Sequence, residues 1–361
     1  MDQVGLMSFW KNKNILLTGH NGFKGSWLSF ILNKFEANVT GISLENDTSP
    51  NLFQTLDLNN NLDSINFNIE NYSKFKDAID EVQPEILIHM AAQPLVGLSY
   101  VKPLETFSSN TLGTLNILES TRNNNCVKAL LIITSDKCYL NQDSLEGYKE
   151  DDMLGGHDPY SASKAAAEIV SQSYIRSFFN EDTNRDIGVA TARAGNVIGG
   201  GDWSRDRIIP DVIRSFYDKK NLDIRNISGI RPWQHVLDSL FGYLELVEKL
   251  YKLSGEYSGP WNFGPDKNSI KPVKYILENF EKINGELNYK INSDNSYKET
   301  NLLLLDSSKS LNKLNWKPVW DIDQSLEYTF NWYKSFYEGI NMKEYTMHQI
   351  DKFLTDKKKK R

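Results

Sequence analysis

The sequence predicts an α/β protein with a doubly wound parallel sheet that is covered by helices on both faces. Three observations predict this fold class: 361 residues with 40% apolar side chains, short apolar runs that alternate with amphipathic stretches, and apolar runs that are continuous. Continuous apolar runs are typical of parallel strands that are buried on both faces. Right-handed crossovers in such a sheet produce a doubly wound fold. In this fold ligands bind at the carboxyl ends of the strands, so we expect the site there.

Six strands and the helices between them can be assigned in order along the first half of the chain. A helix is predicted after the first strand, because Trp27, Leu28, Ile31 and Leu32 recur at helical spacing. The predicted strands cover 14–19, 38–44, 64–69, 85–91, 127–135 and 187–193, and the predicted helices cover 23–35, 72–82, 111–122 and 160–179.

The regular alternation of strands and helices ends near residue 194. We therefore assign residues 1–194 to a first domain, to which segments within about 233–263 return. Residues 195–361 are assigned mainly to a smaller C-terminal α/β lobe, which we expect to bind the substrate, and to a C-terminal tail. The tail ends in the charged run DKKKKR, for which we predict a solvated, mobile segment; binding to an anionic surface is the alternative.

Composition and charge exclude several classes of protein. The chain has 41 basic and 47 acidic residues, a net charge of −6, so it lacks the basic surplus of a nucleic-acid-binding protein. Its two cysteines, Cys126 and Cys138, are too few for a disulfide framework, and we expect both to be reduced. Since the chain has no apolar signal segment and no run long enough to span a membrane, we predict a soluble cytoplasmic protein without a membrane partner.

A glycine-rich turn between the first strand and the first helix predicts a dinucleotide site. The run LLTGHNGFKGSWL contains Gly19, Gly22 and Gly25. In a Rossmann-type fold the first glycine permits the tight turn, the second lets a pyrophosphate approach the backbone, and the third allows close helix–strand packing. The amino end of the helix then offers N–H groups to the phosphates. A purely structural turn is the alternative. The spacing of the glycines resembles that of the short-chain dehydrogenase/reductase superfamily.

The end of the second predicted strand bears on the choice between NAD and NADP. An acidic residue usually binds the NAD ribose there, whereas an arginine accommodates the 2′-phosphate of NADP. Ser43 occupies the position, with Glu45 two residues later, and no arginine is nearby. We therefore predict NAD as the cofactor.

Tyr160 and Lys164 form the candidate proton-transfer pair. They stand four residues apart in YSASK, which places both side chains on one face of a helix. A neighbouring ammonium and the nicotinamide cation of a bound cofactor favour phenolate over phenol, so we predict that Tyr160 acts as a base near neutral pH. A surface pair of tyrosine and lysine is the alternative. The position of the motif beyond the fifth strand of a dinucleotide-binding fold favours catalysis.

The segment LLIITSDKCY, residues 131–140, ends an apolar run with the polar cluster Ser135, Asp136 and Lys137. We expect Ser135 at the carboxyl edge of the sheet, where its hydroxyl can bond a sugar hydroxyl beside Tyr160. A ketoreductase or epimerase needs only this hydroxyl, the tyrosine and its lysine. An acid and a base beside them predict a second proton-handling step, the elimination of water. The alternative for this pair is a solvated turn with a surface ion pair.

Seven segments, spread over about residues 9 to 340, carry a resemblance to a known family. They are FWKNKNILLTGHNGFKGSWLSFIL, HMAAQPLVGLSY, TSDKCY, DPYSASK, ARAGNVIGGGDWSRDRIIPD, IRPWQHVLD and WNFGP. Together they closely resemble the CDP-glucose 4,6-dehydratases, which are extended short-chain dehydrogenase/reductases that act on nucleotide sugars. The resemblance implies conversion of CDP-glucose to CDP-4-keto-6-deoxyglucose and water through bound NAD. It also implies a place in deoxysugar biosynthesis, as for a lipopolysaccharide O-antigen.

The resemblance implies a role for each member of the cluster. Tyr160 takes the proton of the 4-hydroxyl, protonated Asp136 gives its proton to the departing 6-hydroxyl, and neutral Lys137 removes the proton at C5. A second possibility is that Lys137 stays charged and stabilises the enolate, with another group or water as the base. Related dTDP-glucose dehydratases carry Asp-Glu in place of Asp136 and Lys137.

Further ligand contacts are implied position by position. Besides the three glycines, Tyr160 and Lys164, the cofactor is expected to contact Asn21, Phe23, Asn68, Ile69, Ala91, Ala92, Gln93, Asn110 and Thr134. The nucleotide-diphosphate sugar is expected to contact Ser135, Asn196, Arg207, Arg231 and Asn262. Arginine side chains suit the oxygen pairs of a pyrophosphate. The five histidines show no metal-ligand spacing, so no metal site is predicted.

Oligomeric state and two alternative functions complete the expectations. Relatives pair through helices such as 103–124 and 160–179, so the resemblance implies a homodimer or homotetramer. A nucleotide-sugar 4-epimerase of the same superfamily is one alternative function, although epimerases lack the Asp-Lys pair. The other is a catalytically silent dinucleotide-binding protein, which would show damage at the serine, tyrosine or lysine position, and none is damaged here.

Overall fold

The computed structural model describes residues 3–179, 187–292 and 302–360. Its centre is a parallel sheet of seven strands in the order β10-β6-β5-β4-β1-β2-β3, which confirms the predicted doubly wound fold. The strands are β1 (Asn14–Thr18), β2 (Asn38–Ser43), β3 (Asp63–Asn66), β4 (Ile86–His89), β5 (Ala129–Ile133), β6 (Gly188–Ala194) and β10 (Gly259–Phe263). The strand order reverses between β1 and β4, where such sheets bind ligands.

Two hydrophobic cores cover the two faces of this sheet. Alternate residues of one strand belong to different cores: Leu16 lies in one, and its neighbours Ile15 and Leu17 lie in the other. This alternation follows from the two-residue period of a strand, and explains why the central strands are apolar throughout. One core contains residues of α2 (Phe23–Lys34), α10 (Val236–Lys252) and α15 (Met342–Lys360), and the other contains residues of α4 (Tyr72–Val82), α7 (Gly113–Arg122) and α8 (Pro159–Phe178).

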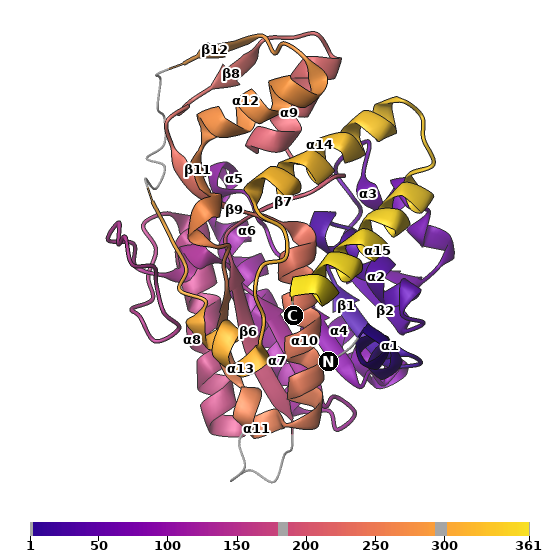
Figure 1. Ribbon diagram of the computed structural model, residues 1–361. Helices are drawn as coiled ribbons and strands as arrows, with labels where there is room; N and C mark the ends of the chain where they lie inside the picture. The colour runs from indigo at the N-terminus through magenta and orange to yellow at the C-terminus, as the bar shows by residue number, and fades with distance from the viewer. Residues whose placement is uncertain (1–2, 180–186, 293–301, 361) are drawn as a thin grey trace.

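The smaller lobe lies at the top of Figure 1 and contains two short sheets with helices. One sheet consists of β7 (Asn196–Ile198), β9 (Ile230–His235) and β11 (Ile270–Pro272), and the other of β8 (Leu222–Ile224) and β12 (Tyr289–Ile291). The longer helices are α9 (Ile208–Tyr217), α12 (Val273–Asn284) and α14 (Ile322–Tyr337). The strand β10 and the helix α10, by contrast, pack with the main sheet. The division of the chain at residue 194 remains our proposal.

Short segments complete the chain and connect these elements. The remaining helices are α1 (Gln3–Trp10), α3 (Leu52–Thr55), α5 (Val96–Val101), α6 (Pro103–Phe107), α11 (Ser254–Tyr257) and α13 (Ser308–Leu314). The short turns are η1 (Leu58–Asn60), η2 (Ser108–Leu112), η3 (Asp136–Cys138) and η5 (Lys267–Ser269). No helix in the described ranges is both long and apolar enough to cross a membrane.

Three sequence predictions need correction. The third strand ends at Asn66 instead of 69, and the π-helical turn η2 precedes α7, so the α-helix begins at Gly113 instead of 111. The predicted mobile tail is wrong for residues 356–360, because α15 continues to Lys360. Lys357 is buried there, with its ammonium 3.3 Å from Glu245 of α10. The charged run therefore packs one lysine inward, a contact that a charge pattern alone does not reveal.

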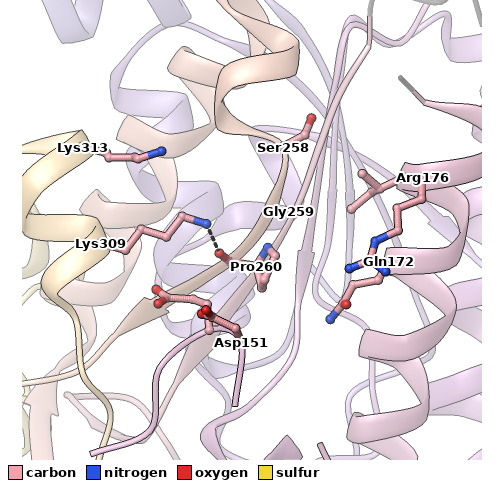
Figure 2. A pocket seen from close by; sticks show the side chains of 10 residues that line it. Asp151, Gln172, Arg176, Ser258, Gly259, Pro260, Lys309 and Lys313 are labelled. Carbon is pink, nitrogen blue, oxygen red and sulfur yellow. Dashed lines mark hydrogen bonds between the residues drawn. The ribbon is translucent and has the colours of Figure 1, made fainter. Parts of the chain in front are cut away.

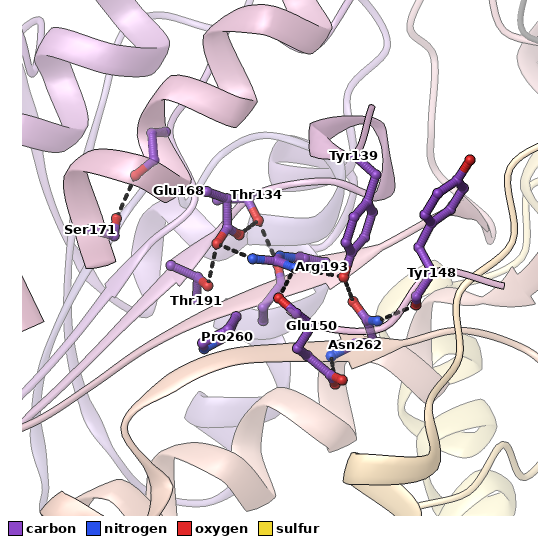
Figure 3. Close-up of polar contacts among 12 residues, drawn as sticks. Thr134, Tyr139, Tyr148, Glu150, Glu168, Ser171, Thr191, Arg193, Pro260 and Asn262 are labelled. Carbon is purple, nitrogen blue, oxygen red and sulfur yellow. Dashed lines mark hydrogen bonds and ion pairs between the residues drawn. The ribbon is translucent and has the colours of Figure 1, made fainter. Parts of the chain in front are cut away.

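A buried ion pair connects the sheet to α8 (Figure 3). Arg193 of β6 donates to Glu168 of α8 over 2.7 Å, and neither side chain is exposed. Glu168 also accepts hydrogen bonds from Thr134, which follows β5, and from Thr191 of β6. Burial raises the pKa of Glu168, but the charge of Arg193 and the hydrogen bonds from Arg193 and the two threonines together lower it. The pair thus holds α8 against the ends of β5 and β6.

We expect Glu168→Gln to destabilise the protein, because it leaves the Arg193 guanidinium buried without a countercharge. The expected decrease in the free energy of unfolding is about 3–5 kcal/mol. It can be measured by denaturant unfolding, in which the midpoint should shift to a lower concentration. Lys76→Met is the control, since it removes an exposed ion pair with Asp80 and should leave the midpoint unchanged. Equal midpoints for the two variants would contradict the structural role of the pair.

Candidate active site

The glycine turn at the carboxyl end of β1 forms an open cradle. Gly19 has φ +72°, and a Cβ on it would lie 2.7 Å from the backbone nitrogen of Ala91. A Cβ on Gly25 would lie 2.0 Å from the carbonyl oxygen of Gly19, so only glycine fits at both positions. At Gly22 a Cβ would meet only this same oxygen, at 3.5 Å, and the helix that follows has no side-chain cap. Open space therefore faces an uncapped helix amino end, as an incoming phosphate group requires.

Two other residues of the turn hold it in place. The side-chain amide of Asn21 donates to the carbonyl oxygen of Leu44 over 2.7 Å, which ties the turn to the end of β2. The ring of Phe23 packs near Gly199, where an added Cβ would lie 3.2 Å from its Cζ atom. Both side chains contact protein, so their expected contact with a cofactor remains a proposal.

The segment after β3 contributes Asn68 and Ile69. The Asn68 side-chain oxygen accepts a hydrogen bond from the backbone of Glu70, while its amide nitrogen has no partner among the described residues. Ile69 is buried against Gly113, where a Cβ would lie 2.6 Å from its Cδ1 atom. Asn68 thus keeps a donor for an adenine, and the side chain of Ile69 packs into the protein.

The loop after β4 is fastened to α8 by Asn110. Its side-chain oxygen accepts from the Gln93 backbone over 2.8 Å, and its amide donates to the Gln93 carbonyl and to the Ser163 hydroxyl. Ala91 is held from the other side by a hydrogen bond to Thr18, and Ala92 lies between them, half-buried. Asn110 uses its side-chain hydrogen bonds inside the protein, so the structure supports a positioning role for it.

The predicted cluster at the end of β5 forms a compact turn. β5 ends at Ile133, and Asp136 and Lys137 begin the turn η3, so they do not point to opposite faces as strand neighbours would. The Ser135 hydroxyl donates to Asp136 Oδ1 over 2.9 Å and accepts from the Lys137 backbone. The Lys137 ammonium lies 3.5 Å from the same oxygen. Asp136 is 2% exposed, which excludes the alternative of a solvated surface pair.

Tyr160 lies at the amino end of α8, next to this turn. Its phenol group lies near the Ser135 hydroxyl and interacts with the charges of Lys137, Asp136 and Arg207. Burial raises the pKa of Tyr160, and this outweighs the lowering effects of Lys137 and of the Ser135 hydroxyl. In the protein alone, burial therefore opposes the phenolate that the sequence predicted.

Lys164 follows Tyr160 by one helical turn and is buried. Its ammonium donates to the carbonyl oxygen of Ile133 over 3.3 Å, which fixes it below the end of β5. Burial lowers the pKa of Lys164 to about 8, although the charge of Glu168 acts in the opposite direction. A lysine with this pKa can release or take up a proton near neutral pH.

Sequence reasoning missed Lys24, which lies in the quoted glycine run. Its ammonium is 5.7 Å from the centre of the buried Tyr243 ring. The pKa of Lys24 is lowered to about 7, because burial disfavours the ammonium and Arg207 repels it, while the charge of Asp136 acts in the opposite direction. Lys24 thus belongs to the same charged cluster. The sequence did contain a signal for Lys24. It lies between the glycines of the turn, and the turn itself does not require a positive charge at that position.

The segment after β6 and the smaller lobe carry three of the predicted substrate residues, and Arg207 among them reaches this cluster. Arg207 precedes α9, donates to Asp202 over 2.9 Å and interacts with the charge of Tyr160. Asn196 begins β7 and pairs with β9, which carries Arg231. The segment before β7 passes close to the carboxylate, since a Cβ on Gly195 would lie 3.0 Å from Asp136 Oδ2.

Two predicted ligand residues belong instead to the buried network of Figure 3. Asn262 is not exposed; its oxygen accepts from Tyr139, and its amide donates to the carbonyl oxygens of Tyr148 and Asp306. Thr134 donates its hydroxyl to Glu168. The Asn262 side chain bonds protein groups on all sides, which favours a structural role, and its contact with the substrate stays a prediction. The Thr134 hydroxyl is likewise used within the protein, so the expected contact of Thr134 with the cofactor falls to its backbone.

A separate hollow lies between α8, β10 and α13 (Figure 2). It has a volume of about 500 Å³ and is lined by acidic and basic side chains, among them Asp151, Arg176 and Lys313. Lys309 on its wall donates to the Pro260 carbonyl over 2.7 Å. None of the residues predicted for catalysis or for ligand binding lines this hollow.

Comparison with known sequences agrees with this site. The model of the GDP-mannose 4,6 dehydratase family matches residues 16–329. The CDP-glucose 4,6-dehydratase of Salmonella typhimurium is 41% identical over 96% of this chain and 98% of the relative. The UDP-glucuronate 4-epimerase of Thermodesulfobacterium geofontis is 27% identical over 90% of this chain and 97% of the relative.

Solved structures share the fold at lower sequence identity. The epimerase Mth375 of Methanothermobacter thermautotrophicus has a TM-score of 0.80 and 21% identity, covering 92% of this chain and 96% of that one. The dTDP-glucose 4,6-dehydratase of Bacillus anthracis, solved with NAD, has a TM-score of 0.73 and 20% identity, covering 91% and 98%. Since the family model and the Salmonella relative match most of its length, this chain belongs to the GDP-mannose 4,6-dehydratase family and, within it, to the CDP-glucose 4,6-dehydratases.

Proposed function

We propose that the protein is a nucleotide-sugar 4,6-dehydratase that converts CDP-glucose to CDP-4-dehydro-6-deoxyglucose and water. The observation that carries this proposal is the position of Asp136. Its carboxyl group is buried, accepts a hydrogen bond from Ser135, and acts through its charge on the pKa of Tyr160. An epimerase needs no such acid beside its tyrosine. The 41% identity to a CDP-glucose 4,6-dehydratase supports the choice of CDP-glucose among nucleotide sugars.

NAD is the cofactor that the residues fit. The open space in front of Gly22 and the uncapped amino end of α2 suit a pyrophosphate, and Asn68 keeps a donor for the adenine. No arginine stands near Ser43 in the sequence, where one would bind the 2′-phosphate of NADP. When bound, NAD supplies the redox chemistry of the reaction, in which hydrogen leaves C4 of the sugar and returns to C6.

The protein side chains then handle the protons. Tyr160 takes the proton of the 4-hydroxyl, and the charges of Lys137 and of a bound nicotinamide favour the phenolate that this requires. Asp136 in its protonated form gives a proton to the departing 6-hydroxyl. Lys137 either removes the C5 proton as a neutral amine or stabilises the enolate as an ammonium, and its position 3.5 Å from Asp136 suits both roles. Lys164 lies on the same face of α8 as Tyr160, so its charge can act on the tyrosine hydroxyl.

The nucleotide-diphosphate part of the substrate is assigned to the smaller lobe. Arg207 and Arg231 are the candidate phosphate ligands, because a guanidinium can offer two hydrogen bonds to a pair of phosphate oxygens. Asn196 stands at the start of β7, which pairs with β9, the strand that carries Arg231. This arrangement would hold the hexose against the cluster at the end of β5.

A second copy of the chain is the proposed protein partner. Adjacent elements α5, α6, η2 and α8 carry exposed apolar side chains, which include Leu98, Val101, Leu104, Phe107, Leu112 and Ile169. Exposed apolar patches of this kind mark interfaces. We propose that the patch pairs with itself in a homodimer, which could assemble further into a tetramer. We place the enzyme in the cytoplasm, where its free cysteines would stay reduced.

Incubation with CDP-, UDP-, dTDP- and GDP-glucose in the presence of NAD tests the proposal. We expect CDP-glucose to yield a product that lacks one water, as seen by mass spectrometry. A product of unchanged mass and inverted C4 would indicate an epimerase, for which the relative from Thermodesulfobacterium is the precedent. No conversion of any of them would favour a silent dinucleotide-binding protein.

We expect Tyr160→Phe to slow turnover by about 100- to 10,000-fold, the contribution of a general base. NAD binding, followed by calorimetry, should persist because the glycine turn is unchanged. Tyr174→Phe is the matched control on the same helix, since its hydroxyl bonds Glu119 away from the cluster. Unchanged turnover of Tyr160→Phe would remove this tyrosine from the mechanism.

We expect Asp136→Asn to slow elimination more than oxidation at C4, because an amide cannot protonate the leaving hydroxyl. Quenched reactions should therefore accumulate a 4-keto sugar that has kept its 6-hydroxyl, detected by mass spectrometry. Asp143→Asn, an exposed change in a nearby loop, should behave as the wild type. If both chemical steps slow equally, Asp136 is not the leaving-group acid.

A further inference from the structure

Arg207, which the proposed function places at the substrate diphosphate, has a buried acidic partner in Asp202, and the inference drawn from this pair rests on that function. The Nη1 atom of the guanidinium donates to Asp202 Oδ2 over 2.9 Å. The other carboxylate oxygen, Oδ1, accepts from the backbone N–H of Ser204 over 3.0 Å. Asp202 is 5% exposed, whereas the arginine side chain is 34% exposed. The carboxylate is therefore the fixed member of the pair, and the guanidinium is the accessible one.

The backbone that carries Asp202 is held by both parts of the chain. The backbone carbonyl of Asp202 accepts a hydrogen bond from the Tyr333 hydroxyl of α14 over 2.6 Å. Two residues earlier, the carbonyl oxygen of Gly200 accepts from the indole N–H of Trp27, in α2, over 2.9 Å. Because these bonds go to backbone atoms, the loop should keep its path when Asp202 loses its carboxylate.

The pair uses only one nitrogen of the guanidinium. Within the described residues, Nε and Nη2 of Arg207 have no hydrogen-bond partner. These two nitrogens form one edge of the planar group, and their N–H bonds can reach two phosphate oxygens together. The guanidinium lies near the catalytic cluster, since it interacts with the charges of Tyr160 and Lys24. A two-pronged donor is thus left available on the side of Arg207 that Asp202 does not occupy.

We propose that Asp202 is a positioning residue that orients Arg207, so that its free edge of Nε and Nη2 binds the diphosphate of the substrate. An arginine side chain has many rotamers, and restricting it on binding costs conformational entropy. Asp202 restricts Arg207 before the substrate arrives, so less of the binding free energy is lost.

The charge of Asp202 acts in the opposite direction, because a carboxylate beside the guanidinium weakens its attraction for an anion. Arg207 is, however, about one third exposed, so water and salt screen this repulsion. Screening does not affect the entropy that is saved by a pre-oriented side chain. We therefore expect the orienting effect to be larger than the repulsion.

The positioning role predicts a defect in binding for Asp202→Ala, measured on the full-length enzyme with NAD. The KM for CDP-glucose should rise about 10-fold while kcat changes little, because the lost contact serves the bound substrate and the transition state equally. The Kd of CDP, measured by calorimetry, should rise by the same factor, because CDP carries the same diphosphate. Asp202→Asn keeps one acceptor oxygen, so its loss of affinity should be only about threefold.

A double-mutant cycle with Arg207→Ala separates positioning from a purely structural role. If Asp202 acts through Arg207, Asp202→Ala should not change the Kd of CDP any further once the arginine is gone. The same cycle with Asp202→Asn serves if the alanine variant does not fold. Asp218→Asn is the matched control, since Asp218 pairs with Lys220 on the surface just after α9 and should leave the Kd unchanged.

Three results would overturn the positioning role of Asp202. An equal loss of CDP affinity with and without Arg207 would mean that Asp202 acts on the fold and not through the arginine. A lower Kd in Asp202→Ala would mean that the carboxylate competes with the diphosphate for Arg207. An unchanged Kd would mean that the pair has no part in binding. A wild type that binds CDP but dehydrates none of the four nucleotide glucoses would instead refute the proposed function itself.

Discussion

The fully buried ion pair between Arg193 and Glu168 is the interaction on which the active site depends. It joins the strand β6 to α8, and α8 carries both Tyr160 and Lys164. Glu168 also accepts a hydrogen bond from Thr134, which immediately precedes Ser135. One carboxylate therefore fixes the distance between the helix with the tyrosine and the turn with the acid. Because a buried charge without its partner is costly, the pair allows these parts little freedom to separate.

Burial and charge act against each other throughout the cluster. Burial raises the pKa of Tyr160 and lowers the pKa of Lys164, so in both cases it favours the neutral form. The reaction, however, needs the tyrosine in its charged form. The charge of Lys137 opposes the effect of burial on Tyr160, and a bound nicotinamide cation would do the same. Because the two effects oppose each other, neither protonation state of these groups is strongly favoured. A reaction with several proton transfers requires groups of this kind.

The site also depends on the contact between the two parts of the chain. Asp136 comes from the end of a strand of the main sheet, yet Gly195 and Arg207 approach the cluster from the segment that leads into the smaller lobe. At its far end the chain returns to the main sheet, where α15 packs against α2 and α10 and Lys34 pairs with Asp351 over 2.9 Å. The substrate lobe is thus held at both ends by elements packed on the sheet.

The sequence by itself determined the parallel sheet and the glycine turn and indicated the candidate proton-transfer residues, because the apolar runs, the glycines of the turn and the spacing of Tyr160 and Lys164 are local properties of the chain. It could not determine which polar side chains face the ligand. Asn262 and Thr134 match the family at ligand positions, but the folded chain surrounds them with buried partners such as Tyr139 and Glu168. The Arg193–Glu168 pair left no signal in the sequence, and Lys24 left only its place between two glycines. Their roles come from residues far away in the sequence, and only tertiary packing decides which charges share one site of low dielectric.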